Sequence, residues 1–314
     1  MKKQMHSLPL KLAPLTAALA MACDGAVLTR PNWEGMAVLG EYVVFEGVKR
    51  AYGLNVPSSY DESKPAPLVI MLHGGGDTGP NFQRWSNLDS LAESVGFITV
   101  FPNGTGYGCT DDLPIEECDD TPPYRWQSGD IDFVRELIGH LRSELTIDRN
   151  RIFAAGFSNG SIFTHIVGCE MADLVAGVAA ISAPFEPRTA TRCFPAMPIP
   201  VMYLHGTDDG SFPWNGDGPY LSAPSTASQW AAINECEEEP DLDWLPDTAD
   251  DGTRVWTETY RDCAGGAEVL FYGVENGGHT WPGHPGFPSA FGLTTQDISV
   301  NLEMLKFFFM QGRF

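Results

Sequence analysis

A chain of 314 residues, of which 43% are hydrophobic and 11% aromatic, can bury a substantial core, so its composition excludes a disordered protein. Its formal net charge of −22, with no basic cluster, excludes a partner held through phosphate contacts, such as a nucleic acid or an anionic membrane surface. We interpret the negative charge as a solubility feature.

The amino-terminal residues have the pattern of an export signal. Lys2 and Lys3 supply positive charge ahead of an apolar stretch over residues 12–22, which is too short to span a bilayer. The residues before Cys23 fit a signal-peptidase site, and they also resemble an imperfect lipoprotein cleavage box. The pattern predicts a signal peptide over residues 1–22 and a secreted or periplasmic protein.

Cysteine usage agrees with export. Setting Cys23 aside leaves an even set of cysteines, which in an exported chain indicates disulfide bonds. These are Cys109, Cys118, Cys169, Cys193, Cys236 and Cys263, and their spacing alone leaves the connectivity open. The fate of Cys23 stays open too, because cleavage would remove it whereas lipidation would anchor the chain to a membrane.

Beyond a linker over residues 23–40, predicted strands and helices alternate along the chain. The strands are apolar or β-branched runs at residues 47–56, 67–72, 97–101, 151–155, 178–181, 201–204 and 269–274. Apolar residues recur at helical spacing over residues 81–95, 130–146, 161–170 and 295–310. This alternation predicts one α/β domain over residues 41–314, with a mainly parallel central sheet and helices on both faces.

The strand at residues 151–155 runs directly into Gly156-Phe157-Ser158-Asn159-Gly160, a G-x-S-x-G sequence. Between a strand and a helix this motif is typical of a nucleophile elbow, a strained turn that presents the serine hydroxyl at the carboxyl edge of the sheet. The flanking positions are glycines because side chains there would clash with the neighbouring strand and helix. Ser158 is therefore the predicted nucleophile.

A serine nucleophile needs a general base, and position along the chain selects among the histidines. In this type of domain the acid, and then the histidine, follow the serine. His279 stands in a glycine-rich segment shortly after the last predicted strand, where the base is required. The alternative is that His279 is a structural loop histidine. His284, also downstream, is expected to be exposed to solvent.

The acid is expected after the strand at residues 201–204, where Asp208 and Asp209 follow a glycine turn. Spacing alone does not separate these two aspartates. An oxyanion hole needs backbone N–H donors, which the motif predicts at Asn159, after the nucleophile, and at Gly75, in the glycine turn of an earlier strand. This chemistry requires no metal and no organic cofactor, and none is predicted.

Two segments, residues 102–128 and residues 207–267, are longer than ordinary connections and carry aromatic residues. Such aromatic side chains either stack on a ring-bearing substrate or pack against the protein beneath these long segments. The predicted substrate-binding residues are Trp126, Trp214 and Trp281, the last because it follows the candidate base closely.

Sequence motifs for other cofactors or metals are absent or incomplete. The sequence has no phosphate-loop or His-Glu zinc motif, its glycines miss the dinucleotide fingerprint, and the acidic run at residues 237–243 lacks the spacing of a calcium loop. Only residues 182–200 separate the two strands between which many lipases insert a lid. The serine is therefore expected in an open cleft, with no large lid domain.

These segments resemble the secreted polyhydroxybutyrate depolymerase and feruloyl esterase family of α/β-hydrolases. The resemblance runs from about residue 47 to about residue 309 and is most specific in residues 148–160, 205–209 and 277–283. It implies the α/β-hydrolase fold and selects Asp209 as the acid. It also implies a Cys236–Cys263 disulfide, to which proximity along the chain adds Cys109–Cys118 and Cys169–Cys193.

The sequence thus predicts an exported serine carboxylesterase that uses Ser158, Asp209 and His279 and forms an acyl-enzyme. The resemblance implies an ester substrate, which can be polymeric: a polyhydroxyalkanoate-type polyester or oligomer, or a feruloyl or acetyl ester of a plant polysaccharide. Two alternatives remain, a serine peptidase on the same fold and a non-catalytic protein that binds such polymers. No nucleic acid is expected as a partner, and a lipid on Cys23 is the expected route to a membrane.

Overall fold

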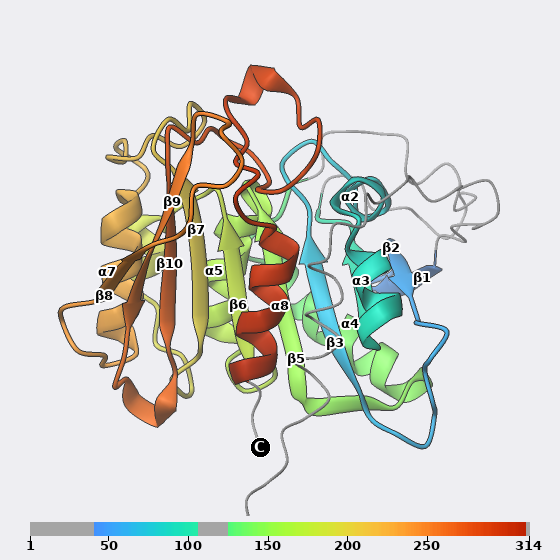
Figure 1. The fold of residues 1–314 in the computed structure, drawn as a ribbon. Helices are drawn as coiled ribbons and strands as arrows, with labels where there is room; N and C mark the ends of the chain where they lie inside the picture. The colour runs from blue at the N-terminus through green and yellow to red at the C-terminus, as the bar shows by residue number, and fades with distance from the viewer. Residues whose placement is uncertain (1–40, 106–124, 312–314) are drawn as a thin grey trace, which may run out of the picture. The chain divides into compact units, whose positions relative to one another are not determined.

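A ten-stranded mixed sheet forms the centre of the computed structural model, which describes residues 41–105 and 125–311 (Figure 1). Its strands lie in the order β1-β2-β4-β3-β5-β6-β7-β10-β9-β8. The strands from β4 to β10 in this order pair in parallel, whereas β1 and β2 at one edge and β9 and β8 at the other pair antiparallel. The predicted mainly parallel sheet is confirmed.

The described elements follow the predicted alternation closely. The strands are β1 (Glu41–Phe45), β2 (Val48–Asn55), β3 (Ala66–Leu72), β4 (Ile98–Pro102), β5 (Ile147–Phe157), β6 (Gly177–Ile181), β7 (Val201–Gly206), β8 (Asp241–Trp244), β9 (Arg254–Tyr260) and β10 (Val269–Glu275). The helices are α2 (Gly79–Ser86), α3 (Leu88–Val95), α4 (Asp130–Glu144), α5 (Asn159–Glu170), α6 (Pro187–Ala190), α7 (Ala223–Ile233) and α8 (Val300–Gln311), with short 3-10 turns η2 (Ala264–Gly266) and η3 (Ser289–Phe291).

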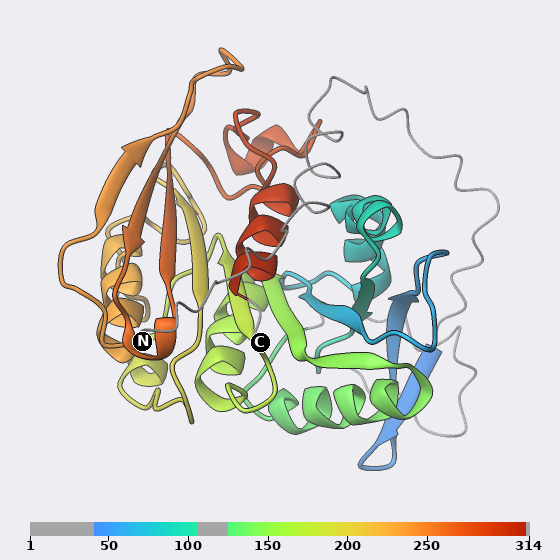
Figure 2. The ribbon, with the colours of Figure 1, turned by 60° about the horizontal axis from the view of Figure 1, so that its bottom comes forward.

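Helices cover both faces of the sheet, as Figure 2 shows for α4 and α5 on one side and α8 on the other. The sheet therefore divides the core into two clusters. Strand β3 contributes to both, because Leu68, Ile70 and Leu72 belong to the first cluster and Val69 and Met71 to the second. All five side chains are fully buried. A strand covered on both faces has a continuous apolar sequence, and this is why β3 can be predicted.

Two predicted helices need correction. The helix predicted over residues 81–95 is two helices, α2 and α3, because Asn87 between them has a left-handed backbone with a φ of 54°. Asparagine tolerates this conformation, which no helix interior can contain. The last helix begins at Val300, not at residue 295, because the carbonyl of Thr295 accepts a hydrogen bond from the N–H of Gly283 in a neighbouring loop.

The long segment over residues 207–267, predicted as a connection, contains regular secondary structure. It contains α7 and the antiparallel pair β8 and β9, which extends the sheet beyond β10. Strand β8 has the sequence Asp-Leu-Asp-Trp and is exposed along its whole length, so it carries no buried apolar signal. Between β6 and β7 the described chain forms only the four-residue helix α6, in agreement with the absence of a large lid domain.

Two disulfides join described cysteines. Cys169 in α5 pairs with Cys193, and Cys236 pairs with Cys263, as predicted. Cys109 and Cys118 lie outside the described residues, as do the predicted signal peptide and linker at residues 1–40. Within the described ranges no helix is long and apolar enough to cross a membrane.

Candidate active site

The loops that follow β5, β7 and β10 meet at one edge of the sheet. These strands run parallel, with β6 between β5 and β7, so their carboxyl ends point the same way. The loops carry Ser158, Asp209 and His279, which are far apart in the sequence. The order of the strands thus brings the predicted nucleophile, acid and base together.

Ser158 occupies the turn between β5 and α5 with a strained backbone, at a φ of 57° and a ψ of −121°. The glycines beside it are required by close contacts. A Cβ on Gly156 would lie 2.2 Å from the carbonyl oxygen of Gly160, and a Cβ on Gly160 would lie 2.0 Å from that of Leu72. No side chain fits at either position unless the backbone moves, as expected of a nucleophile elbow.

His279 bridges Ser158 and Asp209. Its Nε2 lies 2.9 Å from Oγ of Ser158, and its Nδ1 lies 2.8 Å from Oδ2 of Asp209. The carboxylate accepts a hydrogen bond from Nδ1–H, so in the neutral ring Nε2 carries no proton and can accept one from the serine. His279 and Asp209 are buried, whereas Ser158 is only partly buried and can be reached by a substrate.

The structure separates the two aspartates that spacing alone left open, and it agrees with the resemblance in favouring Asp209. Asp209 is buried, and its Oδ1 accepts hydrogen bonds from the backbone N–H groups of Ser211 and Phe212 at 2.8 and 2.9 Å. Asp208 is exposed, and its carboxylate accepts a long hydrogen bond of 3.4 Å from the hydroxyl of Thr207. It is Asp209 that contacts His279.

His205, at the end of β7, supports the acid, although the sequence placed it only at a strand end. Its Nε2 lies 2.8 Å from the carbonyl oxygen of Phe212 and 3.8 Å from Oδ2 of Asp209, and its Nδ1 lies 3.0 Å from the hydroxyl of Tyr203. Burial lowers the pKa of His205, against the opposing effect of Asp209, so the ring is neutral. A neutral ring donates from Nε2 and accepts at Nδ1, which fixes its tautomer.

Two backbone N–H groups near the elbow are available for an oxyanion. Those of Gly75 and Asn159 have no hydrogen-bond partner among the described residues. Asn159 is the first residue of α5, where an N–H has no acceptor within the helix. A Cβ on Gly75 would lie 3.5 Å from Cβ of Asn159, so the two residues are neighbours. This arrangement suits the predicted pair of donors.

Trp126 braces this glycine turn. It is 5% exposed, its backbone N–H donates to Oδ1 of Asn159 at 2.7 Å, and its indole N–H donates to the carbonyl of His73 at 3.1 Å. His73 is fully buried, and its Nε2 accepts a hydrogen bond from the N–H of Gly104 at 2.9 Å. Burial lowers the pKa of His73, which keeps the ring neutral for this contact. Trp126 therefore joins the start of α5 to the turn that carries Gly75.

The other tryptophans predicted to bind substrate pack against protein. Trp281 is 1% exposed, and its indole N–H donates to the side chain of the half-buried Asn301 at 3.2 Å. Trp214 is half-buried, with Trp256 and Phe271 at ring distances of 5.6 and 5.8 Å. Burial leaves Trp281 almost no surface for a substrate, and substrate contact by Trp214 stays a prediction.

Phenylalanines that the sequence analysis did not single out surround His279. The ring centroids of Phe157, Phe212 and Phe291 lie 4.9, 5.6 and 6.1 Å from that of His279. Phe291, in η3, is 45% exposed. These residues come from separate segments of the chain with no shared periodicity, so the sequence carries no signal that would group them.

His284 and the acidic side chains form no second centre. His284 is half-buried between Trp85 and Phe287, at ring distances of 5.9 and 5.5 Å, instead of being exposed as expected. Among the described residues no group of three or more His, Cys, Asp or Glu side chains could hold a metal ion.

Comparisons with known proteins place the chain in a family. The model of the esterase family, described as "Putative esterase", matches residues 47–283. "Putative esterase NocK" of Nocardia uniformis subsp. tsuyamanensis is 27% identical, over 93% of this chain and 88% of the relative. "Feruloyl esterase B" of Piromyces equi is 28% identical over 71% of this chain, and "Bifunctional acetylxylan esterase/xylanase XynS20E" of Neocallimastix patriciarum is 31% identical over 62%. The matched part spans only 41% and 28% of these last two relatives.

Solved structures share the fold. An acetyl xylan esterase from Aspergillus awamori superposes with a TM-score of 0.52 at 14% identity, over 74% of this chain and 92% of that one. A thermostable esterase superposes with a TM-score of 0.54 at 19% identity, over 88% of this chain and 63% of that one. The fold is that of the α/β-hydrolases.

Proposed function

The chain belongs to the esterase family and is a carboxylic ester hydrolase, and we propose that it is an exported serine esterase. In this proposal Ser158 is the nucleophile, His279 the general base and Asp209 the acid that orients it. The supporting observation is the line of two hydrogen bonds, 2.9 Å from Ser158 to His279 and 2.8 Å from His279 to Asp209. Such a line gives a weak nucleophile an oriented base.

Acylation starts at the serine hydroxyl. Oγ of Ser158 attacks the ester carbonyl carbon while Nε2 of His279 takes its proton, and Asp209 stabilises the resulting imidazolium. Negative charge develops on the carbonyl oxygen, where the N–H groups of Gly75 and Asn159 donate hydrogen bonds. The tetrahedral intermediate collapses when Nε2–H of His279 protonates the leaving alcohol, and the acyl group remains on Ser158.

Deacylation repeats these steps with water. His279 removes a proton from a water molecule, which attacks the acyl-enzyme carbonyl against the same oxyanion donors. Collapse of the second intermediate returns the proton to Oγ of Ser158 and releases the carboxylic acid. Each step uses side chains or backbone N–H groups of this chain and water.

For the substrate we propose feruloyl or acetyl esters of plant polysaccharides. Relatives named feruloyl esterase and acetylxylan esterase support this class. Polyhydroxyalkanoate-type polyesters are the second candidate, supported by the motifs at residues 148–160, 205–209 and 277–283. A partly exposed serine, with no large lid among residues 41–105 and 125–311, suits either polymer.

Export rests on two features. The amino-terminal pattern at residues 1–22 is that of a signal peptide, and lipidation of Cys23 would make the protein membrane-anchored instead of free. The disulfides Cys169–Cys193 and Cys236–Cys263 suit an oxidising compartment.

The test is hydrolysis of p-nitrophenyl acetate, butyrate and octanoate and of methyl ferulate by the wild type, Ser158→Ala and Ser143→Ala. Ser143 is an exposed serine on α4, so its variant controls for serine loss away from the site. Turnover that disappears in Ser158→Ala and persists in Ser143→Ala supports the proposal. A folded wild type that cleaves peptides, or binds polymer without cleaving any ester, would replace it with the peptidase or the binding-protein alternative.

A further inference from the structure

A polar groove begins one residue beyond the nucleophile and runs along α5. Its volume is about 410 Å³, within the range of small-molecule sites. Asn159, directly after Ser158, lines one end, and Glu170 and Cys169, eleven and ten residues further on, line the other. Ser158 and His279 are not among its lining residues, so this groove extends the site beyond the reacting atoms.

The floor of the groove is one apolar face of α5. Counted from Asn159, the next groove residues of α5 follow after three, four and seven positions, which places all of them on the same side of the helix. They are Ile162, Phe163 and Ile166. Trp126 stacks on Phe163 at a ring distance of 4.8 Å and closes this floor next to the elbow. Phe163, Trp126 and Ile166 are only 1%, 5% and 9% exposed. The floor thus offers a small apolar surface, chiefly at the half-buried Ile162, close to the proposed oxyanion donor.

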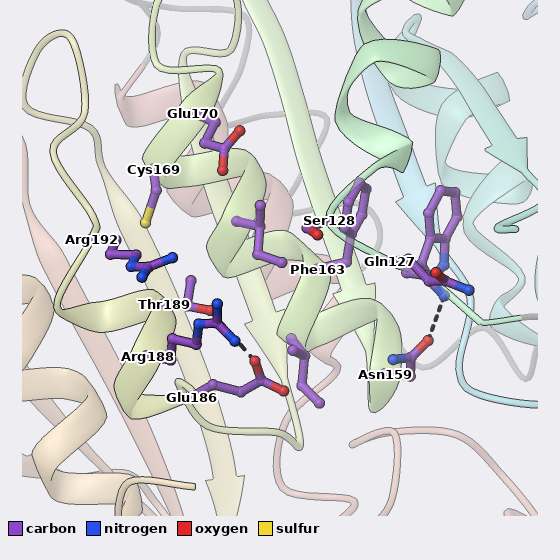
Figure 3. A pocket seen from close by; sticks show the side chains of 13 residues that line it. Gln127, Ser128, Asn159, Phe163, Cys169, Glu170, Glu186, Arg188, Thr189 and Arg192 are labelled. Atoms are coloured by element: carbon purple, nitrogen blue, oxygen red, sulfur yellow. Dashed lines mark hydrogen bonds between the residues drawn. The ribbon is translucent and has the colours of Figure 1, made fainter. Parts of the chain in front are cut away.

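The walls are polar and come from two other segments. In Figure 3, Glu186, Arg188 and Arg192 stand on one side of α5 and Gln127 on the other, with Phe163 between them. Arg188 and Arg192 take part in none of the ion pairs between described residues. Two arginines and two glutamates therefore line the groove, which supplies both hydrogen-bond donors and acceptors.

The disulfide Cys169–Cys193 holds this wall in place. It joins the far end of the α5 floor to the residue directly after Arg192. The short helix α6 with Arg188, and Arg192 just after it, are thereby tied to α5 by a covalent bond in addition to packing.

The presence of both arginine and glutamate side chains in the groove favours a glycan over a polyester. A polyester chain offers only carbonyl and ester oxygens, which accept hydrogen bonds, so the carboxylates of Glu170 and Glu186 would find no donor on it. A sugar chain offers hydroxyls, which donate to carboxylates and accept from guanidinium groups, and C–H faces that suit the floor. We propose that the α5–α6 groove binds sugar residues of a glycan whose acyl ester is held at Ser158. This inference rests on the proposed esterase function.

The experiment compares glycan esters with esters that lack a glycan. The glycan probes are acetylated xylo-oligosaccharides and feruloylated arabinoxylo-oligosaccharides, and the glycan-free probes are p-nitrophenyl acetate, methyl ferulate and a trimer of 3-hydroxybutyrate. The variants are Glu186→Gln and the double variant Arg188→Gln/Arg192→Gln. Their matched controls are Glu136→Gln on α4 and Arg149→Gln on β5, both exposed and outside the groove.

We expect each groove variant to lower kcat/KM for the glycan esters about tenfold, mainly through KM, because a charged hydrogen bond to a hydroxyl is lost. The values for glycan-free esters and for both controls should stay within about twofold of wild type. As a second measurement, Ser158→Ala titrated calorimetrically with the feruloylated oligosaccharide should bind it, and the groove substitutions added to it should weaken that binding.

Three results would overturn the inference. Equal loss on all esters would mean that the groove residues are structural, and unchanged values on glycan esters would mean that sugars lie elsewhere. Selective loss on the 3-hydroxybutyrate trimer would assign the groove to polyester. If the wild type instead hydrolyses no ester of any kind, the esterase proposal itself fails, which differs from each result above.

Discussion

Nε2 of His205 lies 3.8 Å from Oδ2 of Asp209, the same oxygen that accepts the hydrogen bond from His279. The two residues are also joined through the backbone of Phe212, whose carbonyl accepts from His205 and whose N–H donates to Oδ1 of Asp209. His205 thus holds the loop that orients the carboxylate, and Tyr203 holds His205 through a 3.0 Å contact.

Replacing His205 with leucine is expected to lower kcat for methyl ferulate about tenfold with little change in KM, because Asp209 loses its fixed orientation but the substrate contacts remain. His205→Gln, which can still donate to the carbonyl of Phe212, should recover most of the activity. The measurement is kcat, KM and the pH profile of kcat for both variants. A lower Tm with an unchanged kcat and pH profile would show that His205 is only structural.

Trp126→Phe separates bracing from substrate stacking. Phenylalanine keeps an aromatic ring against Phe163 but loses the indole N–H bond to the carbonyl of His73. If Trp126 braces the oxyanion turn, kcat should fall by about tenfold for every ester, p-nitrophenyl acetate included. A rise in KM confined to methyl ferulate would instead show that the ring contacts the feruloyl group.

Two glycine substitutions should have opposite effects on stability. Gly160→Ala places a Cβ 2.0 Å from the carbonyl oxygen of Leu72 and must displace backbone, so we expect a loss of about 3 kcal/mol together with activity. At Gly139, within α4, a Cβ meets nothing within 4 Å, and Gly139→Ala should stabilise the protein by about 0.5–1 kcal/mol. Urea unfolding measures both, and a destabilised Gly139→Ala would contradict the helix argument.

Removing either described disulfide should lower the free energy of unfolding by a similar amount, but the two losses should affect substrate preference differently. The bridges Cys169–Cys193 and Cys236–Cys263 close loops of similar length, with sequence separations of 24 and 27, so each double Cys→Ser variant should lose about 3 kcal/mol. Only loss of Cys169–Cys193, which anchors the groove wall, should reduce the preference for glycan esters. Thermal unfolding and the ratio of kcat/KM for glycan and glycan-free esters test this. Equal loss of preference in both variants would refute it.

Acid should destabilise the fold through its buried histidines. Burial lowers the pKa of His73 and His205, and lowers that of His165 to about 3. Unfolded histidines bind protons below a pKa of about 6.5 while these three stay neutral, so the unfolded state binds more protons and stability falls as pH drops below that value. For His165 the loss approaches about 1.4 kcal/mol per pH unit between the unfolded pKa of about 6.5 and the folded pKa of about 3.

Unfolding by urea at pH 7.5, 6.0 and 5.0 measures this dependence. His165→Gln should be less stable at pH 7.5 because it disturbs the hydrogen bond from Trp230, yet its stability should fall less steeply with acid. An unchanged slope would mean that His165 takes up its proton without unfolding.

The catalytic candidates were predictable because local chemistry restricts them. Gly156 and Gly160 leave room for a backbone turn that no other residue permits, so five adjacent residues are enough to predict the nucleophile elbow. The strand β3 is a continuous apolar run because both of its faces are covered. By contrast, the left-handed break at Asn87 and the exposed strand β8 leave no periodic apolar signal in the sequence.

By itself, the sequence determined the alternating α/β architecture, the elbow serine and the histidine after the last strand, because backbone geometry and strand burial impose those residues locally. Only the tertiary structure showed the contact of Asp209 with His279, placed His205 beside Asp209, buried Trp281 and formed the groove between α5 and α6. These features arise where segments separated by tens of residues pack together. Side-chain orientation, burial and hydrogen bonding at such meetings depend on three-dimensional neighbours, which spacing along the chain does not encode.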